Sequence, residues 1–257
     1  MSNLFARPII FPLIDSTNQY LADQARLGAP EGMVAIADQQ SAGRGRQGRT
    51  WVAGPGTSLL MSMLFRPALD LAEANLVPTI VGLATHQVVG ELTGAECELK
   101  WPNDLLIGGK KVSGLLGEIV PLPPGYAMVV GIGLNLYWPE GPPQTEGDQN
   151  LEGLGDRATT LFDVAGERFD RDHVAAQILQ NIADDYSRLG EPGIAAKIMD
   201  RYRRACGTIG RDVEVQMAAE RYRAHAVGVS DQGRLIIEVQ GELKELDAAD
   251  VVHLRTP

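Results

Sequence analysis

The sequence has 257 residues, enough for one large domain or for a main domain with a small second one. Hydrophobic residues form 44% of the chain and charged residues 22%, which excludes the disordered and fibrous classes. The formal net charge of −10 repels phosphate backbones and so disfavours nucleic acid as a partner. Cys97 and Cys206 are too few for a disulfide framework or a zinc cluster, and we expect both to be buried apolar residues.

The N-terminal stretch carries no targeting pattern. Residues 1–13 lack a basic segment followed by a long apolar core and a small-residue cleavage site. No uninterrupted apolar stretch approaches the roughly 18 residues that a membrane-spanning helix needs. The sequence therefore predicts a cytoplasmic protein with no membrane partner.

Strand and helix patterns alternate along the first half of the chain. Apolar, β-branched runs predict strands at residues 33–37, 59–65, 97–101, 112–120 and 127–136. Apolar residues spaced by three and four predict helices at residues 16–27, which open on a Ser/Thr cap, and at residues 76–92. This alternation predicts an α/β domain.

The second half predicts two helices and then a β module. After a Gly- and Pro-rich loop at residues 139–155, a helix over residues 171–189 is capped by Asp170 or Asp172, and another covers residues 193–206. The tail then alternates polar and apolar residues, with turns at residues 231–233 and at Gly241. We expect a main domain over residues 1–206 and a small β-barrel over residues 207–257 that docks on it.

Residues 43–51, with the sequence GRGRQGRTW, place three arginines within six positions of an acidic protein. Glycines let a backbone approach a ligand closely, and guanidinium groups bind carboxylate or phosphate oxygens in a bidentate fashion. The segment also satisfies the GxGxxG pattern of dinucleotide sites, but the residues after Gly48 cannot propagate the helix that such a site requires. Anion binding is therefore predicted; a solvated hairpin tip with incidental charge is the alternative.

A second cluster lies further along the chain. Lys100-Trp101-Pro102-Asn103-Asp104 ends a strand, and residues 108–114, with the sequence GGKKVSG, lead into the next one. The two segments predict one β-hairpin whose lysines flank the turn. Considered by itself, such a pair of lysines is equally consistent with a solvated surface.

Five segments in order make the sequence resemble the biotin–protein ligases. They are Ser16-Thr17-Asn18, Gln40 before GRGRQGRTW, KWPND, KVSGLLGE and Gly131-Ile132-Gly133-Leu134-Asn135. The resemblance covers residues 15–136 closely and continues more loosely to the C-terminus. It implies a mixed β-sheet flanked by helices, of the type shared by class II synthetases and biotin–lipoate ligases, with a small C-terminal SH3-like β-barrel.

The resemblance also implies an activity: ATP-dependent formation of biotinyl-5′-adenylate, followed by transfer of biotin to a lysine of a biotin carboxyl carrier protein of a carboxylase. The implied biotin-binding residues are Ser16, Thr17, Asn18, Gln40, Gly43, Arg44, Gly45, Arg46, Lys111 and Gly114. The implied residues for ATP and the adenylate are Arg44, Arg46, Arg49, Trp51, Asn103, Lys111 and Asn135.

Lys111, Arg46 and Asp104 are the predicted catalytic residues, and Lys110 is a weaker candidate than its neighbour. Asp104 is a hypothetical base for the transfer step, although an Asp that caps its own turn is equally consistent with the sequence. Trp51 can equally be a core residue, and Asn135 can equally be a turn residue. Mg²⁺ is expected to enter on the ATP phosphates and waters, without metal ligands from the protein.

Three further expectations follow. About fifteen residues precede Ser16, too few for a helix-turn-helix, so a monofunctional ligase without repressor activity is expected. Edge-strand pairing into a homodimer is plausible from the family. The alternative functions are a lipoate–protein ligase, whose family does not show this arginine loop followed by KWPND, and a non-catalytic biotin-binding module.

Overall fold

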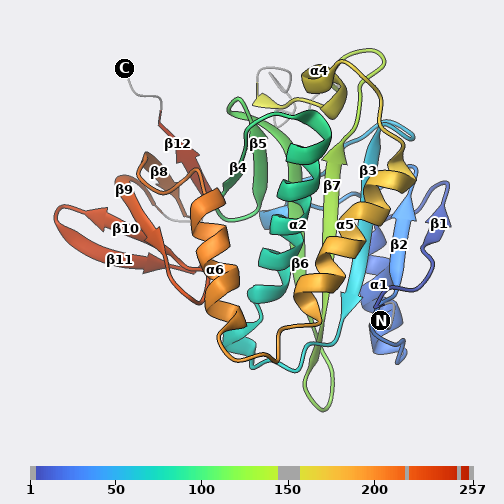
Figure 1. Cartoon of the computed structure of the whole chain (residues 1–257), viewed down its shortest axis with the longest axis horizontal. Coiled ribbons are helices and arrows are strands. Elements are labelled where there is room, and N and C mark those ends of the chain that lie inside the picture. The colour runs from blue at the N-terminus through green and yellow to red at the C-terminus, as the bar shows by residue number, and fades with distance from the viewer. Residues whose placement is uncertain (1–3, 144–156, 218–219, 248–249, 255–257) are drawn as a thin grey trace.

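The computed structural model describes residues 4–143, 157–217, 220–247 and 250–254. Its main domain is built on a seven-stranded sheet with the order β1-β2-β3-β7-β6-β5-β4 (Figure 1). β1 and β2 are parallel, and the other neighbouring pairs are antiparallel, so the sheet is mixed, as expected. Its strands are β1 (Ile9–Phe11), β2 (Val34–Ala37), β3 (Ser58–Phe65), β4 (Cys97–Lys100), β5 (Asp104–Ile107), β6 (Lys110–Pro121) and β7 (Tyr126–Asn135).

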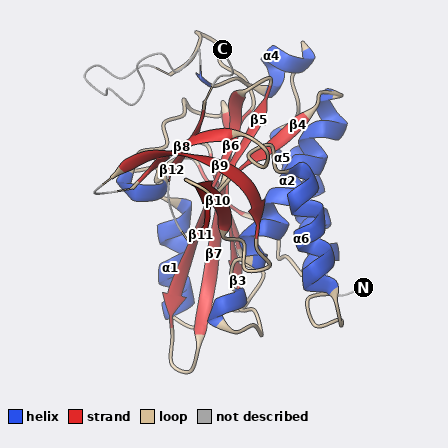
Figure 2. Ribbon diagram, turned by 90° about the vertical axis from the view of Figure 1, so that its left-hand side faces the viewer, coloured by secondary structure: helices blue, strands red, loops and turns tan. Residues whose placement is uncertain are grey.

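Helices cover both faces of this sheet, and Figure 2 shows α1 on one side with α2, α5 and α6 on the other. The helices are α1 (Thr17–Arg26), α2 (Leu76–Thr93), α4 (Leu161–Ala165), α5 (Arg171–Tyr186) and α6 (Ile194–Ala205). Successive strand residues face opposite sides. Ile36 therefore joins the large core beneath α2 and α5, whereas Ala35 packs with Leu21 of α1.

The hairpin expected between Lys100 and Ser113 is wrong in one respect. A further strand, β5, separates two turns: residues 101–103 connect β4 to β5, and Gly108 and Gly109 connect β5 to β6. Both glycines have positive φ, 57° and 76°, which a side chain would disfavour. This arrangement brings Asp104 of β5 close to Lys111 of β6.

The C-terminal module is an open sheet and not the closed barrel that the alternating pattern predicted. Its strands follow the order β11-β10-β9-β8-β12, with β11 and β12 at the two edges. Val213, Val215 and Leu235 are buried and belong to one continuous core with residues of α2 and β4, so the apolar side chains of the module join the core of the main domain. The strands are β8 (Asp212–Gln216), β9 (Arg221–Val229), β10 (Leu235–Val239), β11 (Glu242–Leu246) and β12 (Asp250–His253).

Trp101 holds the two parts together, at the turn before β5. Its backbone N–H donates to Thr208 Oγ1 at 3.0 Å, and its indole Nε1 donates to the Gly233 carbonyl at 2.9 Å. Thr208 also contacts His253 Nε2 at 2.9 Å. Burial, together with nearby positive charge, lowers the pKa of His253 to about 4. The docking expected for the small module is therefore present, and it lies beside the segment that carries Asp104.

Several smaller expectations have a clear outcome. Asp170 and not Asp172 caps α5, because its carboxylate accepts from the His173 N–H at 2.7 Å. Both thiols are free and Cys206 is buried, but Cys97 is half-buried, which corrects its assignment to the core. Much of the loop expected at residues 139–155 lies outside the described residues. None of the described helices is both long and apolar enough to cross a bilayer.

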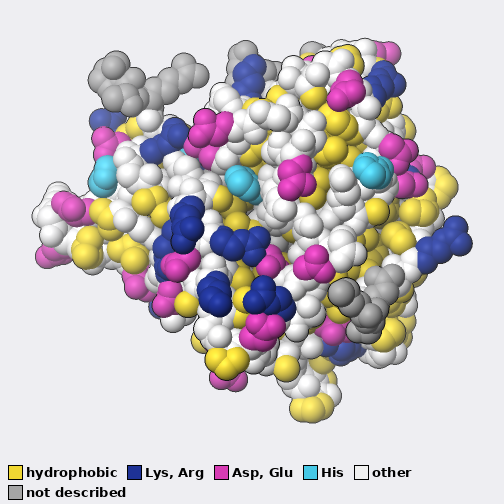
Figure 3. All heavy atoms as spheres, in the orientation of Figure 1, with side chains coloured by type: hydrophobic (Ala, Val, Ile, Leu, Met, Phe, Trp, Pro, Cys, Tyr) yellow, Lys and Arg dark blue, Asp and Glu magenta, His cyan; other side chains and the backbone are white. Residues whose placement is uncertain are grey.

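Basic side chains gather over α6 and the neighbouring C-terminal sheet (Figure 3). Acidic groups lie among them: Arg201 pairs with Asp185 at 2.7 Å, and Arg203 pairs with Asp200 at 2.8 Å. Such exposed pairs stabilise a fold only slightly, but they neutralise much of the local field. The pocket described next, in contrast, holds its cations in a confined space.

Candidate active site

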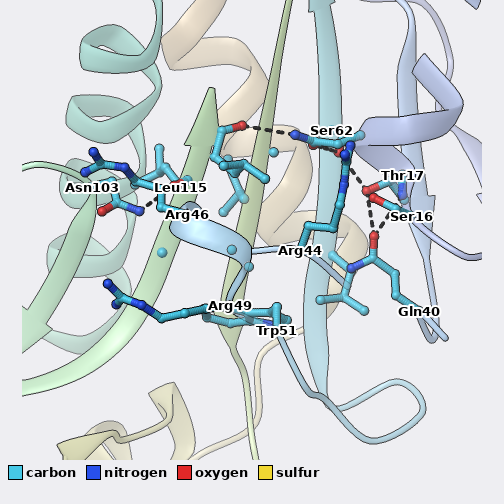
Figure 4. Close-up of a pocket in the computed structure, with 18 of the residues that line it drawn as sticks. Ser16, Thr17, Gln40, Arg44, Arg46, Arg49, Trp51, Ser62, Asn103 and Leu115 are labelled. Carbon is cyan, nitrogen blue, oxygen red and sulfur yellow. Dashed lines mark hydrogen bonds between the residues drawn. The ribbon is translucent and has the colours of Figure 1, made fainter. Parts of the chain in front are cut away.

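A cavity of about 120 Å³ opens on the α1 side of the sheet, beneath the arginine-rich loop (Figure 4). The start of α1, strands β3, β6 and β7, and the loop itself form its walls. The predicted residues that line it are Ser16, Thr17, Asn18, Gln40, Arg44, Gly45, Arg46, Arg49, Trp51, Asn103, Asp104, Lys111 and Gly114. The fold thus gathers segments that are almost 100 residues apart in the sequence.

One end of the cavity is a buried, uncharged hydrogen-bond network around the first turn of α1. Ser16 caps this helix by accepting from the Gln19 N–H at 3.4 Å. Gln40 Oε1 accepts from the Thr17 N–H at 2.8 Å and lies 3.1 Å from Thr17 Oγ1. Asn18 donates from Nδ2 to the Leu116 carbonyl at 3.1 Å. The network therefore fixes the orientation of each of these side chains.

Ser62 on β3 completes this network, although no sequence motif singled it out. Its hydroxyl donates to Asn18 Oδ1 at 2.6 Å and lies 2.7 Å from Thr17 Oγ1. Ser62 pairs across the sheet with Gly131 of β7, where a Cβ atom would lie 2.2 Å from Asn18 Oδ1. A glycine is therefore required at position 131 if Asn18 is to reach Ser62.

The arginine-rich loop is folded over the cavity and not splayed into solvent. Gly45 N–H donates to the Arg49 carbonyl at 2.7 Å, and Trp51 N–H donates to the Gly43 carbonyl at 3.0 Å. A short 3₁₀ turn, η1 (Arg46–Gly48), forms its tip, where Gln47 has a φ of 54°. This geometry favours the ligand-binding interpretation of the loop over the solvated hairpin tip.

The other end of the cavity is positively charged. Arg46 lines this end, and burial lowers the pKa of Arg46 while nearby Asp104 opposes that effect. Arg46 Nη1 and Trp51 Nε1 are buried, and neither has a hydrogen-bond partner within the described parts of the chain. Leaving a buried donor unsatisfied is costly, so both groups are suited to a ligand that supplies acceptor oxygens.

Lys111 and Asp104 form an ion pair at this end, with 2.6 Å between Nζ and Oδ1. The ammonium also lies 5.5 Å from the centre of the Trp51 ring, within the range of a cation–π contact. A Cβ atom at position 114 would lie 2.9 Å from Lys111 Nζ, so Gly114 provides the space that the lysine occupies. Trp51 thus forms a wall of the pocket and is not simply a core residue.

Two neighbours of this pair stabilise the β4–β5 turn. Asn103 Nδ2 donates to the Leu115 carbonyl at 2.6 Å, which fixes the turn before Asp104. Lys100 of β4 lies directly opposite Asp104 of β5 in the strand register. Burial lowers the pKa of Lys100, and the carboxylate of Asp104 opposes this effect. Asp104 therefore lies between two lysines.

Two predicted residues lie outside the cavity. Asn135 ends β7, and its Nδ2 donates to the Thr159 carbonyl at 3.1 Å, a contact that supports the turn-residue interpretation. Gly43 lies behind the loop, where a Cβ atom would come within 2.4 Å of the Trp51 carbonyl. Its role in the structure is to allow the loop to close on itself.

Sequence reasoning missed Ser62, and it assigned no role to Gly131, Gly133 and Glu118 although they lie inside the recognised motifs. A serine inside the apolar run 58–65 and two glycines inside the strand 126–135 were available as indications, because polar and glycine residues are unusual in buried strands. A Cβ atom at position 133 would come within 2.4 Å of the Trp51 ring. Glu118 ends the motif KVSGLLGE, but no role was assigned to it there.

The carboxylates of the site do not form a metal centre. Asp104 is paired with Lys111, and Glu118 is paired with Arg44 at 2.8 Å. Among the described residues, no group of three or more His, Cys, Asp or Glu side chains is placed to hold a metal ion. The donor set in this cavity suits anions, and it does not fit a cation held by the protein.

Comparison with known proteins agrees with this geometry. The model of the biotin/lipoate A/B protein ligase family matches residues 10–135, and that of the biotin protein ligase C-terminal domain matches residues 208–254. A biotin–[acetyl-CoA-carboxylase] ligase of Mycobacterium tuberculosis is 34% identical over 249 residues, which cover 93% of this chain and 86% of that protein. The chain belongs to the biotin–protein ligase family. The resemblance drawn from the five sequence motifs is confirmed.

Other members of the biotin–protein ligase family match over nearly the whole chain. The bifunctional ligase/repressor BirA of Bacillus subtilis is 32% identical over 247 residues, which cover 95% of this chain and 73% of that protein. The solved structure of the biotin protein ligase from Aquifex aeolicus in complex with biotin and ATP superposes with a TM-score of 0.80. Its sequence is 28% identical, and the match covers 98% of this chain and all of that one.

Proposed function

We propose that this protein is a biotin–protein ligase that makes biotinyl-5′-adenylate from biotin and ATP and then transfers the biotinyl group to a lysine of a biotin carboxyl carrier protein. The observation that carries the proposal is a single cavity with a neutral hydrogen-bonding end and a cationic end. Biotin has the same division, with a neutral ureido ring at one end and a carboxylate at the other. The loop over the cavity covers both ends.

The neutral end has the donors and acceptors that a ureido group needs. Asn18 must point Nδ2 at the Leu116 carbonyl, so its Oδ1 takes the single hydroxyl hydrogen of Ser62. The Thr17 hydroxyl therefore donates, and its oxygen lone pairs remain as acceptors for ligand N–H groups. Gln40 uses Oε1 on Thr17 and keeps Nε2 as a donor for a ligand carbonyl. These assignments make the site complementary to a cyclic urea.

The cationic end suits the first half-reaction. A carboxylate oxygen of biotin attacks the α-phosphorus of ATP, the bond to the bridging oxygen breaks, and pyrophosphate leaves. Two anions must approach each other, so fixed positive charge where the new negative charge develops lowers the barrier. We assign that task to Arg46 and Lys111. The unsatisfied Nη1 of Arg46 is available for an oxygen of the α-phosphoryl group.

The covering loop suits the second requirement, which is to retain a mixed anhydride that water would hydrolyse. Its internal hydrogen bonds keep the tip compact above the cavity, and Trp51 forms an apolar wall against Gly133 of the sheet. A water-poor site also strengthens the electrostatic contacts of the adenylate. We therefore propose that the same loop that helps to form the adenylate also keeps it bound.

Asp104 is our proposed base for the transfer step. A free lysine has a pKa of about 10.4 and is protonated at neutral pH. The carrier lysine must therefore lose a proton before its nitrogen attacks the acyl carbon and AMP leaves. Asp104 lies at the cationic end, and its Oδ1 is already bound to Lys111. Oδ2 is the oxygen we assign to the incoming ammonium. The carboxylate would then orient the lysine and accept its proton.

Magnesium would enter this reaction with ATP, bound to phosphate oxygens and water, because the cavity offers cations and paired carboxylates.

We also propose that the protein works in the cytoplasm. A second copy could pair along β1, the outermost strand of the main sheet, where Ile9 and Ile10 are 37% and 47% exposed. We propose no nucleic-acid partner, because the net charge is −10.

Release of pyrophosphate from ATP, measured with biotin, with lipoate and without either acid, tests the adenylation step. Biotin-dependent release with no response to lipoate is the expected result. A response to lipoate in place of biotin would favour a lipoate–protein ligase, because the dithiolane ring of lipoate lacks the urea that the neutral end fits. Binding of biotin without release of pyrophosphate would indicate a non-catalytic biotin-binding module.

A further inference from the structure

Glu118 of β6 joins three parts of the site through one oxygen atom. Its Oε2 accepts from Arg44 Nη2 of the covering loop at 2.8 Å and from Asn18 Nδ2 of α1 at 2.8 Å. Arg44 is 74 residues and Asn18 100 residues away in the sequence. Asn18 is buried, whereas the side chains of Arg44 and Glu118 are 38% and 30% exposed. The ion pair therefore lies at the rim of the cavity, directly beside its neutral end.

The ion pair with Glu118 gives Arg44 a different role from that of Arg46. Its positive charge faces the carboxylate of Glu118, whereas Arg46 lines the cavity and has a buried, unsatisfied nitrogen. The hydrogen bonds of Gly45 and Trp51 hold the loop together internally, and the side chain of Arg44 extends from it to the central sheet. The two arginines of the GRGR segment are thus placed for different tasks: Arg44 for holding the loop and Arg46 for holding the ligand.

We propose that Glu118 is a positioning residue that latches the covering loop through Arg44 and couples its closure to the biotin-binding network through Asn18. The proposal deepens the proposed function and rests on it for its catalytic consequences. Loss of the latch should loosen the loop and let the adenylate escape, while Arg46 and Lys111 still support its formation. A loop that opens more often also exposes its three arginines to protease.

Limited digestion with trypsin, without biotin or ATP, tests the latch directly because trypsin cleaves after Arg44, Arg46 and Arg49 in an open loop. In Glu118→Gln the amide replaces the charge at the same size, and cleavage in the loop should be about fivefold faster, the effect of losing a partly exposed ion pair. Glu191→Gln is the matched control, because it removes the Arg188–Glu191 pair far from the loop. Cleavage of Glu118→Gln at the rate of Glu191→Gln would overturn the proposal.

Salt dependence separates a latch from general destabilisation. Added salt screens exposed ion pairs, so loop cleavage in the wild-type protein should rise with salt concentration toward that of Glu118→Gln, which should respond little. Arg44→Gln removes the other partner and also one trypsin site, so cleavage after Arg46 and Arg49 alone is compared with wild type. That cleavage should show the same fivefold effect even if the glutamate variant folds poorly. The double variant should be no faster than either single one. Additive effects of the two changes would contradict the coupling.

The functional readout is the rate at which biotinyl-adenylate leaves the protein. Glu118→Gln should release it about fivefold faster, while pyrophosphate formation at saturating biotin remains close to wild type. Slower pyrophosphate formation with normal adenylate retention would place Glu118 in the chemistry and overturn the latch. Because digestion requires neither substrate, a positive digestion result combined with no pyrophosphate release would refute the proposed function and leave the latch standing.

Discussion

The two ends of the pocket use opposite kinds of chemistry. At the neutral end, Thr17, Asn18 and Ser62 are buried and satisfy one another through short hydrogen bonds. At the cationic end, Lys111 is about one-third exposed, and Arg46 keeps a buried nitrogen without a partner among the described residues. The first arrangement is complete before a ligand arrives, and the second is not.

This difference shows how binding and catalysis are divided. A preformed neutral network loses little entropy on binding and discriminates through unpaired donors and acceptors, so it determines which acid binds. Fixed cations beside the reacting groups gain most when negative charge develops, so they determine how fast the bound acid reacts. Changes at the cationic end should therefore affect rates, and changes at the neutral end should affect affinity for biotin.

Lys111→Ala should have the largest effect. Removing the ammonium from the cationic end is expected to slow adenylate formation about 10³-fold, the loss typical of a deleted oxyanion donor, with little change in biotin affinity. Biotin-dependent pyrophosphate release and calorimetric biotin binding measure the two quantities. Lys110→Ala is the matched control and should retain its rate. Equal losses in the two variants would contradict the assignment of Lys111.

Asp104→Asn should separate the two half-reactions. The amide cannot accept the proton of the carrier lysine, so transfer is expected to slow about 10²-fold, at the lower end of general-base effects. The adenylate should still form, because Lys111 and Arg46 remain. Single-turnover transfer from preformed adenylate measures the step. Normal transfer would leave Asp104 as a residue that orients Lys111 and its own turn.

Gly131→Ala should break the neutral end. The added methyl group would overlap Asn18 Oδ1 and force that side chain away from Ser62. Overpacking of this kind costs about 1 to 3 kcal/mol, so biotin affinity should fall about 5- to 150-fold, while the KM for ATP stays near wild type. Gly190→Ala, at a position with open space around the glycine, is the control. A parallel loss of ATP affinity would contradict the division between the two ends.

Arg46→Gly should have the smallest effect on formation and a visible effect on retention. Lys111 remains to support adenylation, but the adenylate loses a phosphate contact and should leave about 10-fold faster, as for one charge-assisted hydrogen bond. Released adenylate should then label bystander lysines, which mass spectrometry of an added unrelated protein detects. Retention equal to wild type would refute this role of Arg46.

The main sheet and its long helices were predictable because their apolar periodicity is local. β1 and β5 were missed because runs of three and four residues next to turn residues carry too little pattern. The open C-terminal sheet was mistaken for a barrel because closure depends on which distant strands pair. Val213 and Val215 are buried in a core that continues into the main domain.

The site residues likewise fall into those that the sequence predicted and those that it did not. The motifs located the arginine-rich loop, Gln40 and Lys111, because each belongs to a short segment that resembles a motif of the family. Ser62 and Glu118 act through strand register: Ser62 lies opposite Gly131, and Glu118 lies where the loop returns to the sheet. Their roles follow from three-dimensional contacts between segments that the sequence separates. The motifs likewise suggested Asn135, whose side chain binds the Thr159 carbonyl outside the cavity.

The most direct test of the account is transfer to a biotin carboxyl carrier domain, with biotin and ATP, followed by mass spectrometry of the carrier lysine. The wild-type protein should modify that one lysine with biotin and not with lipoate, and Lys111→Ala should leave it almost unmodified. Equal modification by lipoate would contradict the neutral end as the element that selects the acid. Full modification by Lys111→Ala would contradict the cationic end as the element that drives the reaction.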